Sequence, residues 1–144
     1  MSAYTVDASV HINALNAREQ GSRESQAFLA RVEDERLEVI CPTLLVAEAA
    51  AALSRALGDP EQGLAFACAI RDLPNLALVP LDEPLADLAA ELAARHRLRG
   101  ADAVYAAVAQ RHGALLVTND RQQLERLEGI LPVARPGQAL AGSE

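Results

Sequence analysis

Short apolar runs recur along the chain, separated by longer segments with a different pattern of polar and apolar positions. Five runs of about four residues are rich in valine, leucine and isoleucine, and polar or turn-forming residues bound them, which is typical of strands. These runs cover residues 3–6, 37–40, 76–79, 114–117 and 130–133. We interpret them as five short β-strands.

The segments between these runs carry apolar residues every three or four positions, which predicts amphipathic helices. They cover residues 9–16, 22–35, 43–57, 61–71, 83–95 and 102–112. A further short helix is expected at 122–127. Because strands alternate with helices, we predict an α/β protein: one domain with three layers, α/β/α, around a parallel five-stranded sheet.

Length and composition agree with a single domain. The chain has 144 residues, of which 51% are hydrophobic, enough for one sizeable core. We place the domain at 1–134 and expect the tail, 135–144, to be weakly ordered. No apolar run reaches the roughly 18 to 20 residues that span a bilayer, and the N-terminus lacks the layout of a signal peptide. We therefore expect a cytoplasmic protein without a membrane partner.

The charged residues exclude several classes of protein. All 13 basic residues are arginine, whereas phosphate-loop NTPases, receiver domains and haloacid-dehalogenase phosphatases need a lysine. The net charge of −7 argues against broad attraction to nucleic acid, although it leaves room for a local site. The three histidines and two cysteines have no spacing that would build a zinc site.

Four acidic residues are predicted to meet at one edge of the sheet. Ligands of open parallel sheets bind beyond the carboxyl ends of the strands. Asp7 and Asp120 follow two predicted strands, and Asp102 begins a helix that must start at the same edge. Glu48 lies about 7 Å along its helix from Thr43, at 1.5 Å per residue. A glutamate side chain in that place reaches the other three.

Each acid also has a structural explanation to be weighed. Asp7 and Asp102 are well explained as helix caps or first-turn acids, and Asp120 as the start of an Asx turn. Glu48 has no such role, because it lies in the second turn of an otherwise apolar helix. An unpaired carboxylate there is costly, so Glu48 is the least expected of the four in a purely structural domain.

Together, these carboxylates would repel one another unless a cation lay between them. All-oxygen ligation suits Mg²⁺ or Mn²⁺, which recruit substrate phosphates and support phosphodiester hydrolysis. Positive charge also gathers near the predicted edge and supplies candidate contacts to an RNA backbone, although solvated surface arginines explain it equally well. These residues are Arg95, Arg97, Arg99 and Arg121.

At these positions the sequence resembles the PIN-domain ribonucleases, and among them the small VapC-type toxins. The resemblance spans nearly the whole chain, and the order and spacing of four short motifs carry it. The motifs are 6–9 (VDAS), 46–48 (VAE), 99–109 (RGADAVYAAVA) and 116–120 (LVTND).

The resemblance implies an endoribonuclease that depends on Mg²⁺ or Mn²⁺. It assigns the catalytic and metal-binding roles to Asp7, Glu48, Asp102 and Asp120. It also implies that the hydroxyls of Ser9 and Thr118 support these acids and the water shell of the metal. Such proteins commonly form homodimers and are silenced by a small antitoxin protein, so RNA, an antitoxin and a second copy are the expected partners.

The chain departs from the family pattern after Asp120. Many relatives carry a further acid there with an aromatic residue beside it, whereas this chain has Gln122 and Gln123. A second metal ion is therefore less well supported than the first. Two alternatives stay open: a non-catalytic module that binds a cation or a partner on the same fold, and a structural domain whose caps are acidic. Metal-dependent cleavage of RNA separates these from a nuclease.

Overall fold

The computed structural model describes residues 3–142. The strands are β1 (Tyr4–Val6), β2 (Val39–Pro42), β3 (Leu76–Val79), β4 (Leu115–Val117) and β5 (Val133–Ala134). The helices are α1 (Ala8–Leu15), α2 (Ser22–Asp34), α3 (Leu44–Leu57), α4 (Pro60–Arg71), α5 (Glu83–His96), α6 (Gly100–His112), α7 (Arg121–Leu127) and α8 (Pro136–Ala141). None of these helices is long and apolar enough to cross a membrane.

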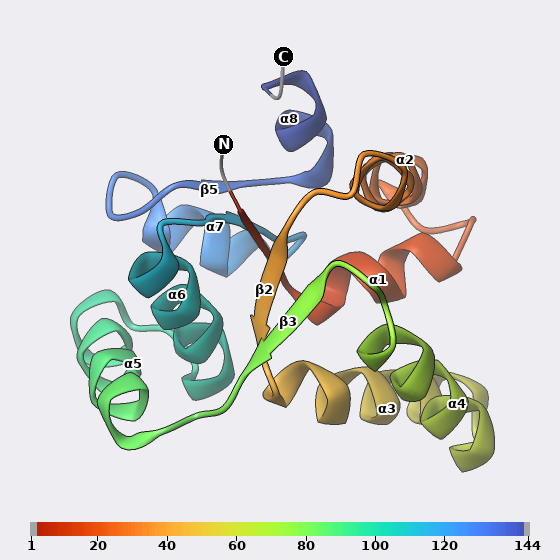
Figure 1. Cartoon of the computed structure of the whole chain (residues 1–144), viewed down its shortest axis with the longest axis horizontal. Helices are drawn as coiled ribbons and strands as arrows, with labels where there is room; N and C mark the ends of the chain where they lie inside the picture. The colour runs from red at the N-terminus through yellow and green to blue at the C-terminus, as the bar shows by residue number, and fades with distance from the viewer. Residues whose placement is uncertain (1–2, 143–144) are drawn as a thin grey trace.

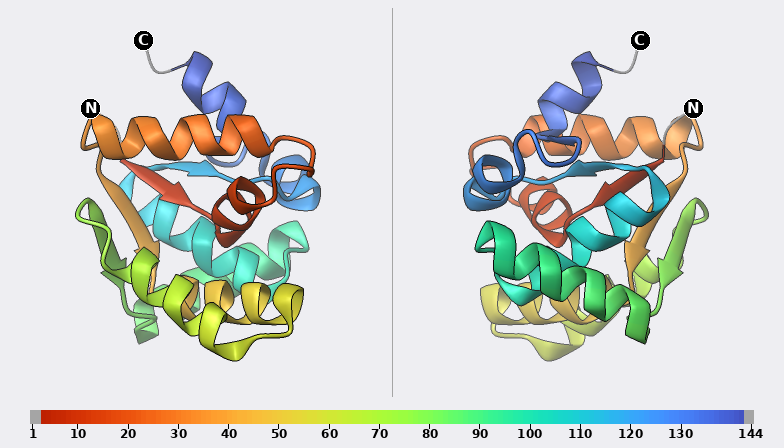
Figure 2. Two further views of the ribbon diagram at one scale, coloured as in Figure 1. Left: turned by 90° about the vertical axis from the view of Figure 1, so that its right-hand side faces the viewer. Right: turned by 90° about the vertical axis from the view of Figure 1, so that its left-hand side faces the viewer.

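The five strands form one parallel sheet in the order β3-β2-β1-β4-β5, which confirms the predicted fold class. Figure 1 shows α5 and α6 on one side of the sheet and α1 and α2 on the other. The side views in Figure 2 look onto these two faces in turn, and α4 lies on the same face as α1 and α2. The three predicted layers are therefore present.

Helix α6 lies deepest in the molecule. Every residue from Asp102 to Ala109 is buried, since α6 packs against β1, β2 and β4 and also against α5. Alanine at four of these positions, 103, 106, 107 and 109, lets the neighbouring elements approach closely, because an alanine side chain ends at Cβ. The buried face carries Asp102 to the carboxyl edge of the sheet.

Two strands begin more than one residue later than the sequence pattern predicts. Arg36 takes up a left-handed conformation, φ 52°, and the amide of Leu37 donates to the Val32 carbonyl at 2.9 Å. Gly129 does the same after α7, and the amide of Leu131 donates to Leu127. In both places the first apolar residues complete the C-terminal turn of a helix, so the strands cover 39–42 and 133–134 rather than 37–40 and 130–133.

The tail differs from its predicted weak order, because α8 forms over 136–141. Pro136 suits the first helical turn, and the Arg135 amide donates to Oε1 of Gln138 at 2.8 Å. Ala139 is buried, α8 packs against α2, and Nη1 of Arg31 donates to the Leu140 carbonyl at 3.1 Å. These tertiary contacts, rather than helix propensity, order the segment. Residues 143–144 lie outside the described part of the chain.

Candidate active site

Strand register places Asp7 against Thr118. β1 and β4 pair in parallel with Val6 opposite Val117, so the residue after each strand lies beside the other. The Thr118 hydroxyl donates to Oδ2 of Asp7 at 2.9 Å, and both side chains are buried. Asp7 is the N-cap residue of α1 but makes no capping hydrogen bond with its side chain. Its carboxylate therefore serves the sheet edge rather than the helix.

The two predicted supporting hydroxyls hold the loop after β4. The Asp120 amide donates to Oγ1 of Thr118 at 3.0 Å, and the Asn119 amide donates to Oγ of Ser9 at 3.1 Å. Because Thr118 donates to Asp7 and accepts from Asp120, one hydroxyl connects two of the four acids. This arrangement fixes the loop relative to α1.

Asp102 and Asp120 are joined by one guanidinium. Nε of Arg99 donates to Oδ2 of Asp102 at 3.0 Å, and its Nη2 donates to Oδ2 of Asp120 at 2.6 Å. Asp120 also caps α7, because its Oδ1 accepts from the Gln123 amide at 3.1 Å. The hydrogen bond to Asp102, with the charges of both acids, raises the pKa of Arg99. The structural and functional interpretations of Asp120 are thus compatible.

Glu48 reaches the site through a tyrosine. The hydroxyl of Tyr105 donates to Oε1 of Glu48 at 2.7 Å. Tyr105 lies three residues after Asp102, so both side chains project from the same side of α6. Burial raises the pKa of Tyr105 above its usual range, which keeps the hydroxyl protonated as a donor.

Burial and like charges act together on Asp7. Burial raises the pKa of Asp7 to about 6, the hydroxyls of Ser9 and Thr118 oppose the shift, and the carboxylates of Glu48 and Asp102 add to it. Each of the four acids is therefore linked to at least one other by a shared partner or by its charge. Such strain on a carboxylate is what a nearby cation would relieve.

The four acids do not form a ready-made ligand set. Within residues 3–142, no three aspartate, glutamate, histidine or cysteine side chains lie where they would hold one metal ion. The predicted metal-binding roles of Asp7, Glu48, Asp102 and Asp120 stay a prediction. The chemistry of the donors fits a hard divalent ion, and the guanidinium between Asp102 and Asp120 shows that a cation is accommodated there.

The sequence profile of the PIN domain matches residues 4–130, which is most of the chain. The chain belongs to the PIN-domain family. No curated protein sequence matches it closely enough to count as a relative.

Solved structures share the PIN fold of this chain. VapC20 of Mycobacterium tuberculosis, a Sarcin-Ricin loop cleaving toxin, superposes with a TM-score of 0.74 at 20% identity, covering 92% of this chain and 99% of that one. The DNA-bound VapBC of Salmonella typhimurium gives 0.66 at 18%, covering 94% and 99%. PAE2754 from Pyrobaculum aerophilum gives 0.66 at 24%, covering 96% and 86%.

Four arginines were predicted to lie near the acids of this PIN domain. Of these, Arg99 contacts two acids, Asp102 and Asp120. Arg95 and Arg121 instead pair with Glu91 and Glu125, each on its own helix. Arg97 is an exposed residue that ends α5 in a left-handed conformation, φ 55°. The three lie on the surface, where a polyanion can reach them.

Sequence reasoning missed three residues of this PIN-domain site. Tyr105 lies in the motif at 99–109 and has no predicted role, although its spacing of three from Asp102 indicates that the two share a face of the helix. Gln123, which with Gln122 stands where many relatives have a further acid and an aromatic residue, is fully buried, and its Nε2 donates to Oδ1 of Asp102 at 2.9 Å. Arg135, in the supposedly weak tail, donates through Nη1 to the Asn119 carbonyl at 3.3 Å, and no local pattern indicated this contact.

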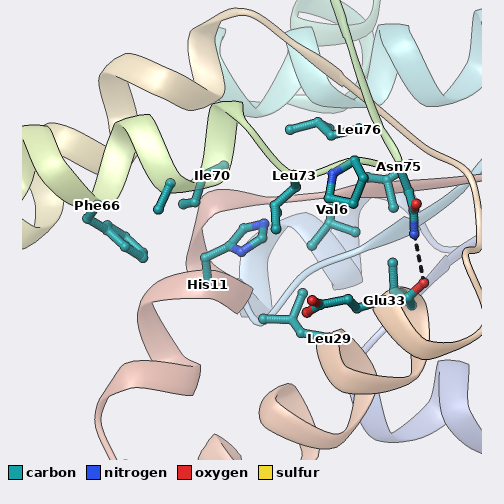
Figure 3. Close-up of a pocket in the computed structure, with 13 residues that line it drawn as sticks. Val6, His11, Leu29, Glu33, Phe66, Ile70, Leu73, Asn75 and Leu76 are labelled. Atoms are coloured by element: carbon teal, nitrogen blue, oxygen red, sulfur yellow. Dashed lines mark hydrogen bonds between the residues drawn. The ribbon is translucent and has the colours of Figure 1, made fainter.

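An apolar cavity of about 270 Å³ lies away from the acids, between α1, α2, α4 and the sheet. Figure 3 shows His11, Leu29 and Phe66 lining it. Burial alone lowers the pKa of His11 to about 4. The cavity includes none of the four acids, so this apolar cavity and the polar site are separate features.

Proposed function

We propose that this PIN domain is a metal-dependent endoribonuclease and the toxin of a toxin–antitoxin pair. The observation that carries the proposal is the linked set of carboxylates at the carboxyl edge of the sheet. Asp7 is buried and near like charges, and Asp102 and Asp120 share a cationic partner. A structural domain gains nothing from keeping a buried carboxylate with a raised pKa beside two more acids.

In the proposed site, Asp7, Asp102 and Asp120 hold a Mg²⁺ or Mn²⁺ ion, with Glu48 completing the set. When bound, the ion polarises the phosphodiester and lowers the pKa of a water molecule. The hydroxyl of Thr118 orients Asp7, and Tyr105 orients Glu48. These supports fix the carboxylates before substrate arrives, and such fixed geometry makes a metal site effective.

The proposed RNA contacts are electrostatic. Arg97 and Arg121 are exposed, and Arg95 lies on the last turn of α5, so a phosphate backbone crossing the acids meets positive charge on the flanking helices. Few aromatic residues are present, 3% of the chain, so base stacking contributes little. The expected dependence on salt follows from counterion release.

The partner proposals draw on the solved relatives. Complexes of VapBC bound to DNA have toxin chains with this fold, which supports a small antitoxin as the partner of this chain. Co-expression of the chain with the product of the adjacent gene, followed by co-purification, tests this. The proposed homodimer is tested separately by light scattering, where a monomer at micromolar concentration contradicts it. We also propose that the protein is located in the cytoplasm.

The central test is cleavage of structured RNA by the purified chain. We expect cleavage with Mn²⁺, none after chelation, and none in Asp7→Asn or Asp102→Asn. Cleavage that persists under chelation, or in both variants, contradicts the proposal. Metal binding without cleavage of any RNA favours instead the non-catalytic module that binds a cation or partner on this fold.

A further inference from the structure

Arg99 occupies an unusual position among the acids. It is the N-cap residue of α6 and follows the left-handed turn that ends α5. Its side chain is 66% exposed, yet it donates to Asp102 and Asp120 through two different nitrogens, Nε and Nη2. An exposed arginine seldom holds two carboxylates from separate elements at once, because the ordering of its long side chain costs entropy. The repulsion between the two acids offsets that cost here.

We propose that Arg99 is a built-in counter-ion: its guanidinium takes the place of the divalent ion between Asp102 and Asp120, and metal binding displaces it. This inference rests on the proposed nuclease function, which supplies the metal. It concerns what the chain does before the metal arrives. The metal-free protein then avoids two adjacent uncompensated carboxylates, and the released guanidinium stays near the place where a phosphate binds.

The distances explain why a guanidinium and a metal ion exclude each other. The two Oδ2 atoms contact Arg99 at 3.0 and 2.6 Å through separate nitrogens. A Mg²⁺ ion bound to both would lie about 2.0–2.1 Å from each, where the Arg99 nitrogens now contact these oxygens, so the ion and the guanidinium would compete for the same oxygen atoms.

In both Asp102 and Asp120, one carboxylate oxygen is held by Gln123 and the other is held by Arg99. Gln123 holds Oδ1 of Asp102 through Nε2 and Oδ1 of Asp120 through its amide. Both Oδ2 atoms face Arg99. Gln123 is fully buried, whereas the exposed side chain of Arg99 can rotate into solvent at little cost. Displacement of Arg99 therefore frees one oxygen of each acid while the other keeps its orientation.

The first test compares Mn²⁺ binding by calorimetry in the full-length wild type, Arg99→Gln and Arg111→Gln. Arg111 is the matched control, because it pairs with Asp82 at 3.6 Å near the other end of the same helix. We expect Arg99→Gln to bind Mn²⁺ about 3- to 10-fold tighter, as for loss of one exposed charged competitor, and Arg111→Gln within twofold of wild type. Equal or weaker binding by Arg99→Gln overturns the inference, as does absence of Mn²⁺ binding in all three.

A second variant guards against a folding defect. Arg99→Lys keeps the charge but lacks the planar fork that contacts two acids together. We expect its Mn²⁺ affinity to fall between those of the wild type and Arg99→Gln. Without metal, the thermal unfolding temperature of Arg99→Gln should be lower than that of the wild type. With saturating Mn²⁺ the two unfolding temperatures should converge. If the difference in unfolding temperature is the same with and without Mn²⁺, the metal does not displace Arg99.

The third test observes the guanidinium directly. The Nε–H resonance of Arg99, identified by its absence in Arg99→Gln, is expected in the NMR spectrum of the metal-free protein and should shift or broaden on titration with Mg²⁺. An unchanged resonance at saturating Mg²⁺ overturns the inference. The proposed function fails on different evidence: if Mn²⁺ binds and displaces Arg99 but no RNA is cut, the counter-ion stands and the nuclease does not.

Discussion

Asp7 is the N-cap residue of α1, and His11 lies four residues later within that helix. Both are buried, yet their environments differ. Burial disfavours the charged form of each, raising the pKa of Asp7 to about 6 and lowering that of His11 to about 4. Asp7 accepts a hydrogen bond from the Thr118 hydroxyl, and the negative charges of Glu48 and Asp102 also raise its pKa. His11 faces an apolar cavity lined by Leu29 and Phe66.

The difference shows that a shifted pKa does not by itself identify a functional residue. Burial in the cavity accounts for the shift of His11 completely. The carboxylate of Asp7 lies among hydrogen-bond donors and like charges, and a cation would relieve the repulsion within such a set. We conclude that the organised partners, rather than the burial, distinguish the site from the core.

The largest effect should come from removing the carboxylate. Asp7→Asn is expected to reduce Mn²⁺-dependent RNA cleavage on the order of a thousandfold, above the 10- to 100-fold typical of residues that only orient a metal ligand. The cleavage rate of His11→Gln should stay within about twofold of the wild-type rate. Single-turnover cleavage by the two variants checks this. Comparable losses in both would remove the distinction between site and cavity.

The residues of the candidate site differ in how well the sequence alone predicted their positions. Asp7, Asp102 and Asp120 follow strand ends or begin a helix, so the rule that parallel strands end at one edge predicted that they lie near one another. In the structure the side chains of Thr118 and Arg99 connect them, while their role in a metal site stays a prediction. Tyr105 and Arg135 depend on how α6 and α8 pack, which no local pattern contains. The predicted strand starts at Leu37 and Ile130 were also wrong, since apolar residues that complete a helical turn resemble the start of a strand.

Gln123 illustrates the remaining limit. A glutamine after an N-capping aspartate predicts an ordinary surface residue, because glutamine is mostly exposed. In the fold it is fully buried, and its Nε2 donates to Asp102, while its Oε1 atom has no hydrogen-bond partner among residues 3–142. The burial results from the packing of α7 against the rest of the domain, so tertiary contacts gave this residue a role that its sequence neighbours do not indicate.

The next effect concerns pH. His11 has a folded-state pKa near 4 against 6.5 for an exposed histidine, so the unfolded chain gains a proton first as the pH falls. The contribution of neutral His11 to stability is complete above about pH 6.5 and is lost towards pH 4, up to roughly 3 kcal/mol. Urea unfolding of wild type and His11→Leu from pH 7 to 4 measures the difference.

For His11→Leu, the control is His112→Gln, an exposed position at the end of α6. It should follow the wild type at every pH. Asp7 acts with the opposite sign, since its raised pKa means that its stabilising protonated form is lost as the pH rises from about 4 to about 6. If His11→Leu and the wild type lose stability in parallel, His11 is not the buried neutral group described above.

A smaller effect is expected from the hydroxyl that links two acids. Thr118→Val removes the donor to Asp7 and the acceptor for the Asp120 amide, leaving both without that partner. We expect a loss of about 2 kcal/mol in metal-free stability, as for a buried polar group left unsatisfied. Thr43→Val is the control, because Thr43 is exposed and makes no capping hydrogen bond with its side chain. Equal losses would mean that the link contributes nothing specific.

The smallest effect tests whether a hydroxyl near the acids differs from one in the core. Tyr105→Phe keeps the buried ring but removes the hydrogen bond to Glu48. Since Glu48 is only half-buried, water replaces the lost donor, and we expect a stability loss of about 1 kcal/mol. The Mn²⁺ affinity should fall several-fold, because Glu48 is no longer oriented towards the other carboxylates. Tyr4→Phe provides the comparison, since Tyr4 packs edge-on against Phe28 at 5.4 Å; if both variants bind Mn²⁺ equally well, Tyr105 is a core residue like Tyr4 and Glu48 needs no support from it.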